Sequence, residues 1–331
     1  MILAGDIGGT KTVLALFEHN KQSFTLHQSQ TFASQDFYKF EDILQQFLSQ
    51  NSDPEIDYTC LGVAGPVIDG ACTTTNLPWH LTETSLTQIS KAIGSKLLND
   101  LEAAAYGMLF LSQEQKTVLN PHVKASSNAN IAVIAAGTGL GEAILYWDGK
   151  QHYPIASEGG HTDFAPRSDQ EIGLLNFLRD EFGHVSYERI LSGPGLYNIY
   201  RYIRHCQFAP EPEWLSEELK VSDPAAVIGK MALENKDSNC VNAIKMFLSI
   251  YGAEAGNLAL KCNAFGGIYI GGGIAPKLLP LMQGDLFLQS LSDKGRFKAM
   301  LEKMPVVVAT EPLTPLIGAA QYGLKQWQET R

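Results

Sequence analysis

The chain contains one short pattern twice: an apolar run, a turn rich in glycine and threonine, and a second apolar run. The first copy extends from Leu3 to Phe17 and the second from Ile131 to Trp147. Short apolar runs bounded by glycines favour strands, so each copy predicts a hairpin. Because a recurring pattern indicates duplicated structural units, the sequence predicts two related halves. The two glycine turns are then expected to bind one polyphosphate from opposite sides.

The first turn has the chemistry of a phosphate-binding loop. Its glycines let backbone N–H groups approach phosphate oxygens, and Thr10 adds a hydroxyl donor. Asp6, at the mouth of the turn, is placed to hold a hydrated Mg²⁺ against those phosphates. The expected nucleotide contacts are Gly5, Asp6, Ile7, Gly8, Gly9 and Thr10. A hairpin whose glycines serve only the turn is the alternative.

Two commoner nucleotide motifs do not fit the sequence. A P-loop needs Gly directly before Lys and a helix afterwards, whereas Thr10 precedes Lys11 and the following run reads as extended. The dinucleotide fingerprint needs a G-x-G-x-x-G spacing that opens a helix, and neither glycine turn supplies it.

Length and composition limit the possible partners. The 331 residues exceed the ~250–300 that one hydrophobic core supports, so two domains are expected. A net charge of −10 without clustered Lys or Arg argues against nucleic acid or an anionic membrane as partner. Scattered cysteines and the absence of a long apolar segment predict a cytoplasmic protein.

Asn99 and Asp100 end a short apolar run and directly precede an alanine-rich helix. Asp100 is a candidate catalytic carboxylate, and the alternative is that it only caps the helix. Earlier in the chain, Asn76 and Trp79 lie in a polar loop that suits contact with a polar small molecule or a purely structural role.

Three further stretches carry candidate binding groups. Glu158 and His161 suit hydrogen bonding to the vicinal hydroxyls of a sugar. A metal site that adds Asp163 is disfavoured, because glycines interrupt the ligand spacing. Gly137 and Thr138 lie in the second glycine turn. Gly272 lies in a triple glycine before a helix that is expected to start near Pro276, and the N-terminus of such a helix can bind adenosine or its phosphates. A close crossing of strand and helix is the alternative for Gly272.

Taken together, these residues resemble the bacterial ATP-dependent glucokinases of the hexokinase and actin-like ATPase superfamily. The matching segments are Gly5–Thr10, Thr75-Asn76 with Trp79, Asn99-Asp100, 137–141, 158–166, 183–196 and 293–297. Lys11 departs from the pattern, because it is more typical of the related repressor-type sugar kinases. Those relatives carry a cysteine-rich zinc motif that is absent from this chain.

The resemblance implies two actin-like (ribonuclease H-like) α/β domains that flank a deep cleft. The smaller would comprise residues 1–110, completed by 312–331, and the larger residues 111–311. The implied reaction transfers the γ-phosphoryl group of MgATP to the 6-hydroxyl of glucose, which is the first step of glycolysis. The implied oligomeric state is a homodimer. Alternatives are a kinase for another hexose or an N-acetylhexosamine, a non-catalytic sugar sensor and a chaperone-like ATPase.

The resemblance also implies roles for individual residues. Asp100 would be the catalytic base. The sugar-binding set would be Asn76, Asn99, Asp100, Glu158, His161 and Glu188. The nucleotide-binding set would be the Gly5–Thr10 loop with Gly137, Thr138 and Gly272.

Overall fold

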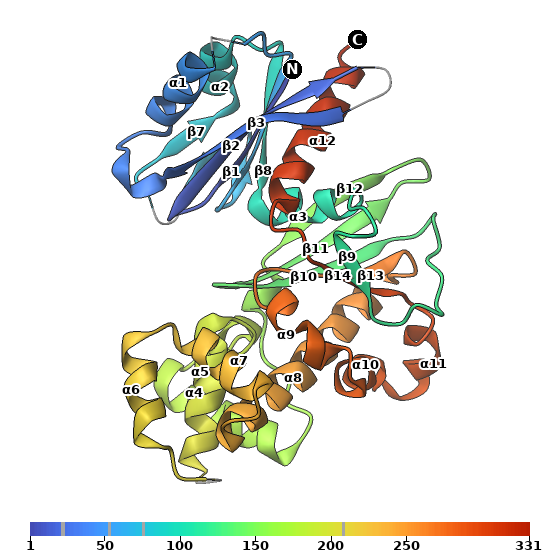
Figure 1. The fold of residues 1–331 in the computed structure, drawn as a ribbon. Coiled ribbons are helices and arrows are strands. Elements are labelled where there is room, and N and C mark those ends of the chain that lie inside the picture. Colours follow the sequence, from blue (N-terminus) through green and yellow to red (C-terminus); the bar gives the residue numbers. More distant parts are fainter. Residues whose placement is uncertain (21–23, 52–53, 75–76, 207–208) are drawn as a thin grey trace. The chain divides into compact units, whose positions relative to one another are not determined.

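The computed structural model describes residues 1–20, 24–51, 54–74, 77–206 and 209–331 (Figure 1). Asn76, one of the expected sugar ligands, lies outside these residues. The chain forms two compact units, which are described separately below. Unit 1 comprises Met1–Gln115, His152–Ala156 and Glu311–Arg331, and unit 2 comprises Lys116–Gln151 and Ser157–Thr310.

Unit 1 is built on a five-stranded sheet of order β3-β2-β1-β4-β8. Its strands are β1 (Ile2–Ile7), β2 (Lys11–His19), β3 (Phe24–Ala33), β4 (Tyr58–Val63) and β8 (Gly94–Asn99). The predicted hairpin of β1 and β2 is antiparallel, whereas β1, β4 and β8 run parallel. Because parallel strands end at the same edge of a sheet, the carboxyl ends of these three strands lie together.

Helices cover both faces of this sheet. Leu3 and Ile7 of β1 belong to a core that includes apolar residues of α1 (Phe40–Gln50) and α2 (Glu83–Ser90). Ile2 and Ala4 belong to the opposite core, formed with α3 (Asp100–Met108) and α12 (Thr314–Glu329). A small sheet of β5 (Val67–Ile68), β6 (Ala71–Thr73) and β7 (His80–Thr82) completes the unit.

Helix α12 packs very closely against α3. A Cβ atom on Gly318 would collide with the backbone oxygen of Ala103, and one on Gly107 would collide with that of Thr314. Since only glycine allows this separation, the C-terminal helix holds the helix that begins at Asp100.

Unit 2 repeats the strand pattern of unit 1. Five of its strands, β11-β10-β13-β14-β9 in that order, belong to the second large sheet, and β12, most of which is assigned to unit 1, is the sixth strand of that sheet. The strands are β9 (Lys116–Val118), β10 (Ile131–Ala136), β11 (Leu140–Trp147), β12 (His152–Ser157), β13 (Gly267–Gly271) and β14 (Val306–Ala309). β10 pairs antiparallel with β11 and parallel with β13, as β1 does with β2 and β4, which confirms the predicted duplication.

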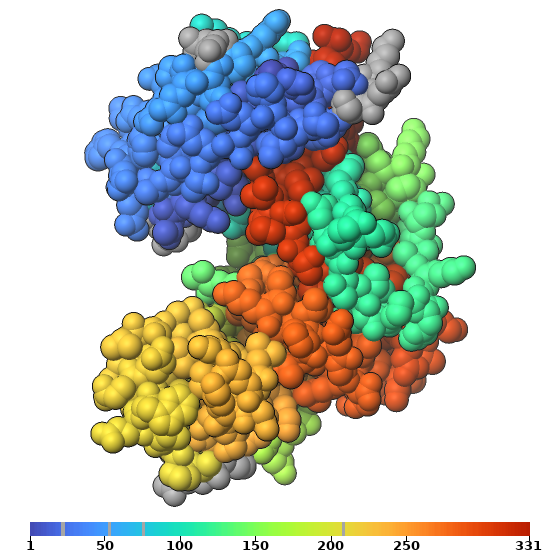
Figure 2. Space-filling model, viewed as in Figure 1, coloured from blue at the N-terminus to red at the C-terminus, as the bar shows by residue number. Residues whose placement is uncertain are grey.

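Eight of the α-helices in the described residues belong to unit 2. Those in the middle of this part of the sequence are yellow in Figure 2 and form much of the visible surface of the unit. They are α4 (Asp169–Phe182), α5 (Gly193–His205), α6 (Glu213–Val221), α7 (Pro224–Leu233), α8 (Ser238–Cys262), α9 (Ala275–Met282), α10 (Asp285–Ser292) and α11 (Lys298–Leu301). None of the helices in the described ranges combines the length and apolar character needed to cross a bilayer.

The long helix α8 is the centre of the unit 2 core. It spans 25 residues and buries Phe247 and Tyr251 completely. Helix α5 begins at Gly193, because the Ser192 hydroxyl accepts a hydrogen bond from the Gly195 N–H and caps the helix.

Candidate active site

The first glycine turn is closed by its own backbone and held by Ser34. The Gly8 N–H donates to the Lys11 carbonyl at 3.0 Å, and the Ser34 hydroxyl donates to the Gly8 carbonyl at 2.7 Å. The Ser34 N–H also donates to the Thr10 carbonyl at 3.0 Å. The Thr10 side chain is exposed. Sequence reasoning missed Ser34, because nothing near it in sequence marks it as part of the turn.

The predicted phosphate loop contains residues of two kinds. Gly5 is buried within β1, and a Cβ there would collide with Leu14 and Leu61, so its absent side chain serves packing. Ile7 is also buried, with its side chain in the core. Gly8, Gly9 and Thr10 are partly or fully exposed, so they are the members of the loop with accessible backbone.

Asp6 faces Asp100 rather than bulk solvent. Side chains alternate along a strand, so Asp6 shares the face of Ile2 and Ala4, which is the face covered by α3. Burial raises the pKa of Asp6 to about 6, with the negative charge of Asp100 as the second cause, while Lys11 acts in the opposite direction. Two carboxylates therefore lie close enough to repel each other.

Gly62 leaves room beside Asp6 for the first turn of helix α3. It is the register partner of Asp6 on β4, and a Cβ there would lie 2.9 Å from the Cβ of Ala103 and 3.7 Å from the Cα of Asp100. Because a larger residue would occupy this space and displace α3, the glycine keeps the N-terminus of α3 against the sheet.

Asn99, not Asp100, caps helix α3. The Asn99 side chain accepts a hydrogen bond from the Leu101 N–H at 2.9 Å, and the Glu102 carboxylate accepts one from the Asn99 N–H at 2.9 Å. This is a capping box. Although Asp100 Oδ1 also accepts from the Leu101 N–H at 2.8 Å, the purely structural explanation of Asp100 as the cap is weakened, since the neighbouring residue fills that role.

Trp79 has a structural role. Its side chain is 2% exposed, its ring lies 6.0 Å from that of Phe40, and its indole N–H donates to the Phe37 carbonyl at 3.3 Å. Of the two roles predicted as alternatives for Trp79, these contacts favour the structural one, because the ring joins the small sheet to α1.

The second glycine turn meets the triple glycine in unit 2. The Gly137 N–H donates to the Gly139 carbonyl at 2.8 Å, and Thr138 at the tip is exposed. Gly272 has φ +80°, and a Cβ there would collide with the carbonyl of Ala136, so a close backbone crossing requires glycine. The crossing predicted as the alternative for Gly272 is thus real, and Gly272 is also exposed beside the turn.

Glu158, His161 and Glu188 come together in unit 2, as the sugar-binding prediction requires. Nε2 of His161 lies 3.9 Å from the Glu158 carboxylate, and Nδ1 lies 4.0 Å from that of Glu188. Glu188 also accepts a hydrogen bond from the Leu140 N–H at 3.0 Å, which joins this group to the second glycine turn. The exposed side-chain fractions of Glu158 and His161 are 77% and 60%, so both are accessible to a ligand.

Asp163 does not join Glu158 and His161. Its carboxylate is 92% exposed and pairs with His184 at 2.8 Å. Across the ranges that the structure describes, no three His, Cys, Asp or Glu side chains gather as a metal site.

The comparisons with known proteins identify the family of the chain. The family profile described as Glucokinase matches residues 3–326. A curated glucokinase from Trichormus variabilis is 40% identical over 336 aligned residues, which cover 97% of this chain and 98% of the relative.

Solved structures show the same fold. A glucokinase from an Antarctic psychrotroph has a TM-score of 0.86 at 32% identity, covering 98% of both chains. A glucokinase of the ROK family from Streptomyces griseus, solved in complex with glucose and AMPPNP, has a TM-score of 0.64 at 20% identity and covers 98% of this chain and 99% of that one. The fold is therefore the two-domain actin-like ATPase fold of the sugar kinases.

Proposed function

The chain belongs to the glucokinase family and is an ATP-dependent hexose kinase, and on that premise we propose how its residues divide the work of the reaction. Unit 1 supplies the catalytic base and the first phosphate-binding turn. Unit 2 supplies the second phosphate-binding turn and the hexose-binding group of Glu158, His161 and Glu188.

Asp100 is the general base in this proposal. Its carboxylate accepts the proton of the hexose 6-hydroxyl while that oxygen attacks the γ-phosphorus and ADP departs. General-base assistance of this kind contributes about 10²- to 10⁴-fold to the rate. The observation that carries the assignment is its position: Asp100 follows β8 at the carboxyl edge of the sheet, beside Asp6, while Asn99 caps the helix.

The nucleotide enters the reaction as MgATP, and the groups near Asp6 suit a divalent cation. A carboxylate whose pKa is raised by burial and by a second carboxylate is relieved by a positive charge, and oxygen donors are those that Mg²⁺ prefers. Asp6 would hold the cation, directly or through water, and the bound cation would neutralise charge on the phosphates.

The two glycine turns bind the phosphates through backbone N–H groups, helped by the hydroxyls of Thr10 and Thr138. Gly272 admits the nucleotide close to the backbone. Glucose and AMPPNP are the ligands held by the Streptomyces griseus relative, which supports glucose and ATP as the substrates here.

In the hexose-binding group, carboxylates accept from sugar hydroxyls and the imidazole donates or accepts. Asn99 retains hydrogen-bonding capacity for this purpose. Its amide uses one donor on the Gly65 carbonyl at 3.1 Å, and each amide has two. Asn76 is proposed to join them.

A coupled assay of the purified protein with MgATP and a panel of hexoses tests the proposed substrates. We expect glucose to give the highest kcat/KM and mannose, fructose and N-acetylglucosamine to give lower values. A higher kcat/KM for one of the other sugars would reassign the substrate, and ATP hydrolysis that does not depend on any sugar would contradict the kinase proposal.

We also propose a cytoplasmic homodimer. The five cysteines are free in the structure, which suits a reducing compartment. Light scattering coupled to size-exclusion chromatography gives the mass directly: twice the chain mass of 36.2 kDa supports the dimer and a single chain mass contradicts it.

A further inference from the structure

A pair of glutamates is buried in unit 2 and has no part in the reaction as proposed. Glu142 on β11 is 1% exposed and Glu254 on α8 is 0% exposed. Burial raises the pKa of Glu142 to about 7, and the negative charge of Glu254 raises it further, while Lys261 acts in the opposite direction. Near neutral pH, therefore, Glu142 is protonated for much of the time, which removes the repulsion between two buried carboxylates.

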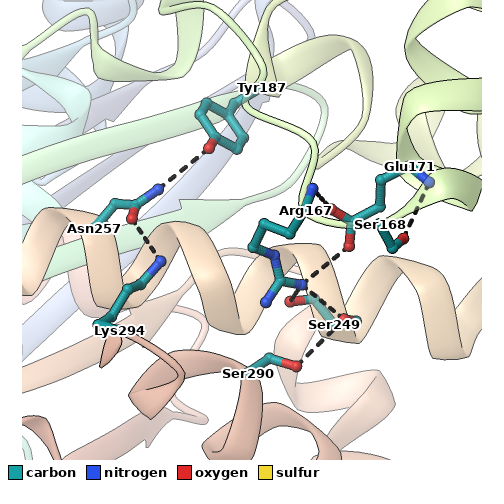
Figure 3. Close-up of polar contacts among 8 residues, drawn as sticks. All are labelled: Arg167, Ser168, Glu171, Tyr187, Ser249, Asn257, Ser290 and Lys294. Atoms are coloured by element: carbon teal, nitrogen blue, oxygen red, sulfur yellow. Dashed lines mark hydrogen bonds and ion pairs between the residues drawn. The ribbon is translucent and has the colours of Figure 1, made fainter. Parts of the chain in front are cut away.

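Glu254 is held by further polar partners. Its carboxylate accepts from Asn257 Nδ2 at 2.8 Å and from Lys261 Nζ at 3.4 Å. Asn257 Nδ2 also donates to the Tyr187 hydroxyl at 3.2 Å, and Lys294 Nζ donates to Asn257 Oδ1 at 2.6 Å (Figure 3). These contacts, with the charge interaction between Glu142 and Glu254, define the Glu142–Glu254 network: Glu142, Tyr187, Glu254, Asn257, Lys261 and Lys294.

One end of the network touches the segment that carries Glu158 and His161. A Cβ atom on Gly159 would collide with Glu142 Oε2, so the carboxyl group packs directly against the Gly159 backbone. The Ser157 hydroxyl donates to the Glu142 carbonyl at 2.8 Å and accepts from the Gly159 N–H at 3.2 Å. The position of this segment therefore depends on where Glu142 lies.

The other end of the network touches the segment that carries Glu188. Tyr187 directly precedes Glu188, and its N–H donates to the Thr162 carbonyl at 3.0 Å. The phenol is fixed by Asn257 on α8. Both segments of the hexose-binding group thus rest on the same buried network.

We propose that Glu142 and Glu254 are positioning residues, which place Glu158, His161 and Glu188 for hexose binding through the backbone of Gly159 and the side chain of Tyr187. The inference rests on the proposed role of those three residues. Neither glutamate needs to touch the sugar, because each acts on the segment that does.

The arrangement makes hexose binding dependent on pH. The pKa of Glu142 is raised, so its neutral form, which does not repel Glu254, is present at low pH and is lost as the pH rises through about 7. Above that pH two buried carboxylates repel each other beside Gly159. The charged groups on the surrounding elements are Glu254 and Lys261 of α8, Glu158 and His161 near Gly159, Glu188 beside Tyr187, and Lys294.

Steady-state kinetics of Glu142→Ala and Glu142→Gln test the proposal. Removing the side chain should raise the glucose KM by about tenfold, the effect of ~1.4 kcal/mol, and change the MgATP KM by less than about threefold. Glutamine keeps the shape and stays neutral at every pH, so it should restore the glucose KM and abolish its rise between about pH 6 and pH 9.

The matched control is Glu171→Gln. Glu171 is also a buried carboxylate of unit 2, 5% exposed and paired with Arg167 at 3.0 Å, in a separate group of contacts (Figure 3). It should leave the glucose KM unchanged. A control as defective as Glu142→Ala would overturn the proposal, as would a wild-type glucose KM in Glu142→Ala or the same alkaline rise of KM in Glu142→Gln as in the wild type.

A parallel measurement separates this inference from the proposed function. Glucose binding by His161→Ala and Glu158→Gln reports on the hexose-binding group itself. If both bind glucose normally, the proposed site is wrong. If both lose binding while Glu142→Ala retains it, only the positioning role is wrong. Because Glu142→Ala removes a buried group, its melting temperature is measured first, and the pH profile of Glu142→Gln decides the matter if the alanine variant does not fold.

Discussion

The two glycine hairpins have the same strand pairing but carry different chemistry. In each hairpin, the residue pair next to the last one before the turn occupies the corresponding position. This pair is Asp6 and Val13 in unit 1, and Ala135 and Gly141 in unit 2. On the other side, Asp6 pairs with Gly62, and Ala135 pairs with Gly271. A glycine therefore occupies the corresponding place on the next strand in both sheets, whereas a carboxylate is present only in the first.

This difference indicates that the two related hairpins have different functions. Both turns offer backbone N–H groups, which suit phosphate oxygens equally. Only unit 1 places Asp6 and Asp100 together, at the cost of repulsion that raises the pKa of Asp6. Cation binding at Asp6 and proton transfer at Asp100 are thus expected from unit 1, and uncharged contacts to the nucleotide from the second hairpin.

The largest expected effect comes from removing the base. Asp100→Asn should lower kcat by about 10²- to 10⁴-fold, because the amide cannot accept the hydroxyl proton. Glucose affinity, measured by calorimetry, should stay within about threefold of the wild type, since the amide keeps the shape and hydrogen-bonding capacity of the side chain. Normal turnover in this variant would show that the base is another group.

A smaller loss is expected when the second carboxylate of unit 1 is removed. Asp6→Asn should lower kcat/KM for MgATP by roughly ten- to a hundredfold, because contacts to charged groups contribute about 1.5–3 kcal/mol. Its effect should appear in the nucleotide kinetics and not in the glucose KM. An equal loss of glucose affinity would place Asp6 with the hexose instead.

The same substitution should affect stability in a pH-dependent way. Since the pKa of Asp6 is raised to about 6, the wild type is stabilised by its protonated form at low pH and loses that stabilisation as the pH rises through about 6. Asp6→Asn cannot ionise, so its stability relative to the wild type should increase by up to about 3 kcal/mol between about pH 4 and pH 7.5. Thermal unfolding of both proteins measures this, and a difference that is independent of pH would contradict the raised pKa.

The smallest expected effect comes from giving the second hairpin a carboxylate. Ala135→Asp should raise the MgATP KM by about threefold to tenfold, through repulsion of the phosphates by roughly 1 kcal/mol, and salt should reduce the increase. Ala135→Asn, which has nearly the same shape without the charge, is the matched control. If the two variants behave alike, the effect is steric and the electrostatic distinction between the hairpins fails.

Local patterns were sufficient for much of the fold. Short apolar runs on either side of glycine turns predicted both hairpins, and their recurrence predicted the duplication. Such predictions succeed because they depend on neighbours along the chain. The role of Trp79 stayed open between ligand contact and structure, because its environment is set by Phe37 and Phe40, which lie far away in sequence.

The sequence by itself determined the family, the two hairpins and the residues that carry chemistry, because glycine turns, a carboxylate before a helix and a Glu-Gly-Gly-His run are local features. Tertiary structure alone decided what surrounds them. Ser34 reaches the first turn, Asp100 raises the pKa of Asp6, and Glu142 packs beneath Gly159. These contacts join segments that only the packing of sheets and helices brings together, so no local pattern predicts them.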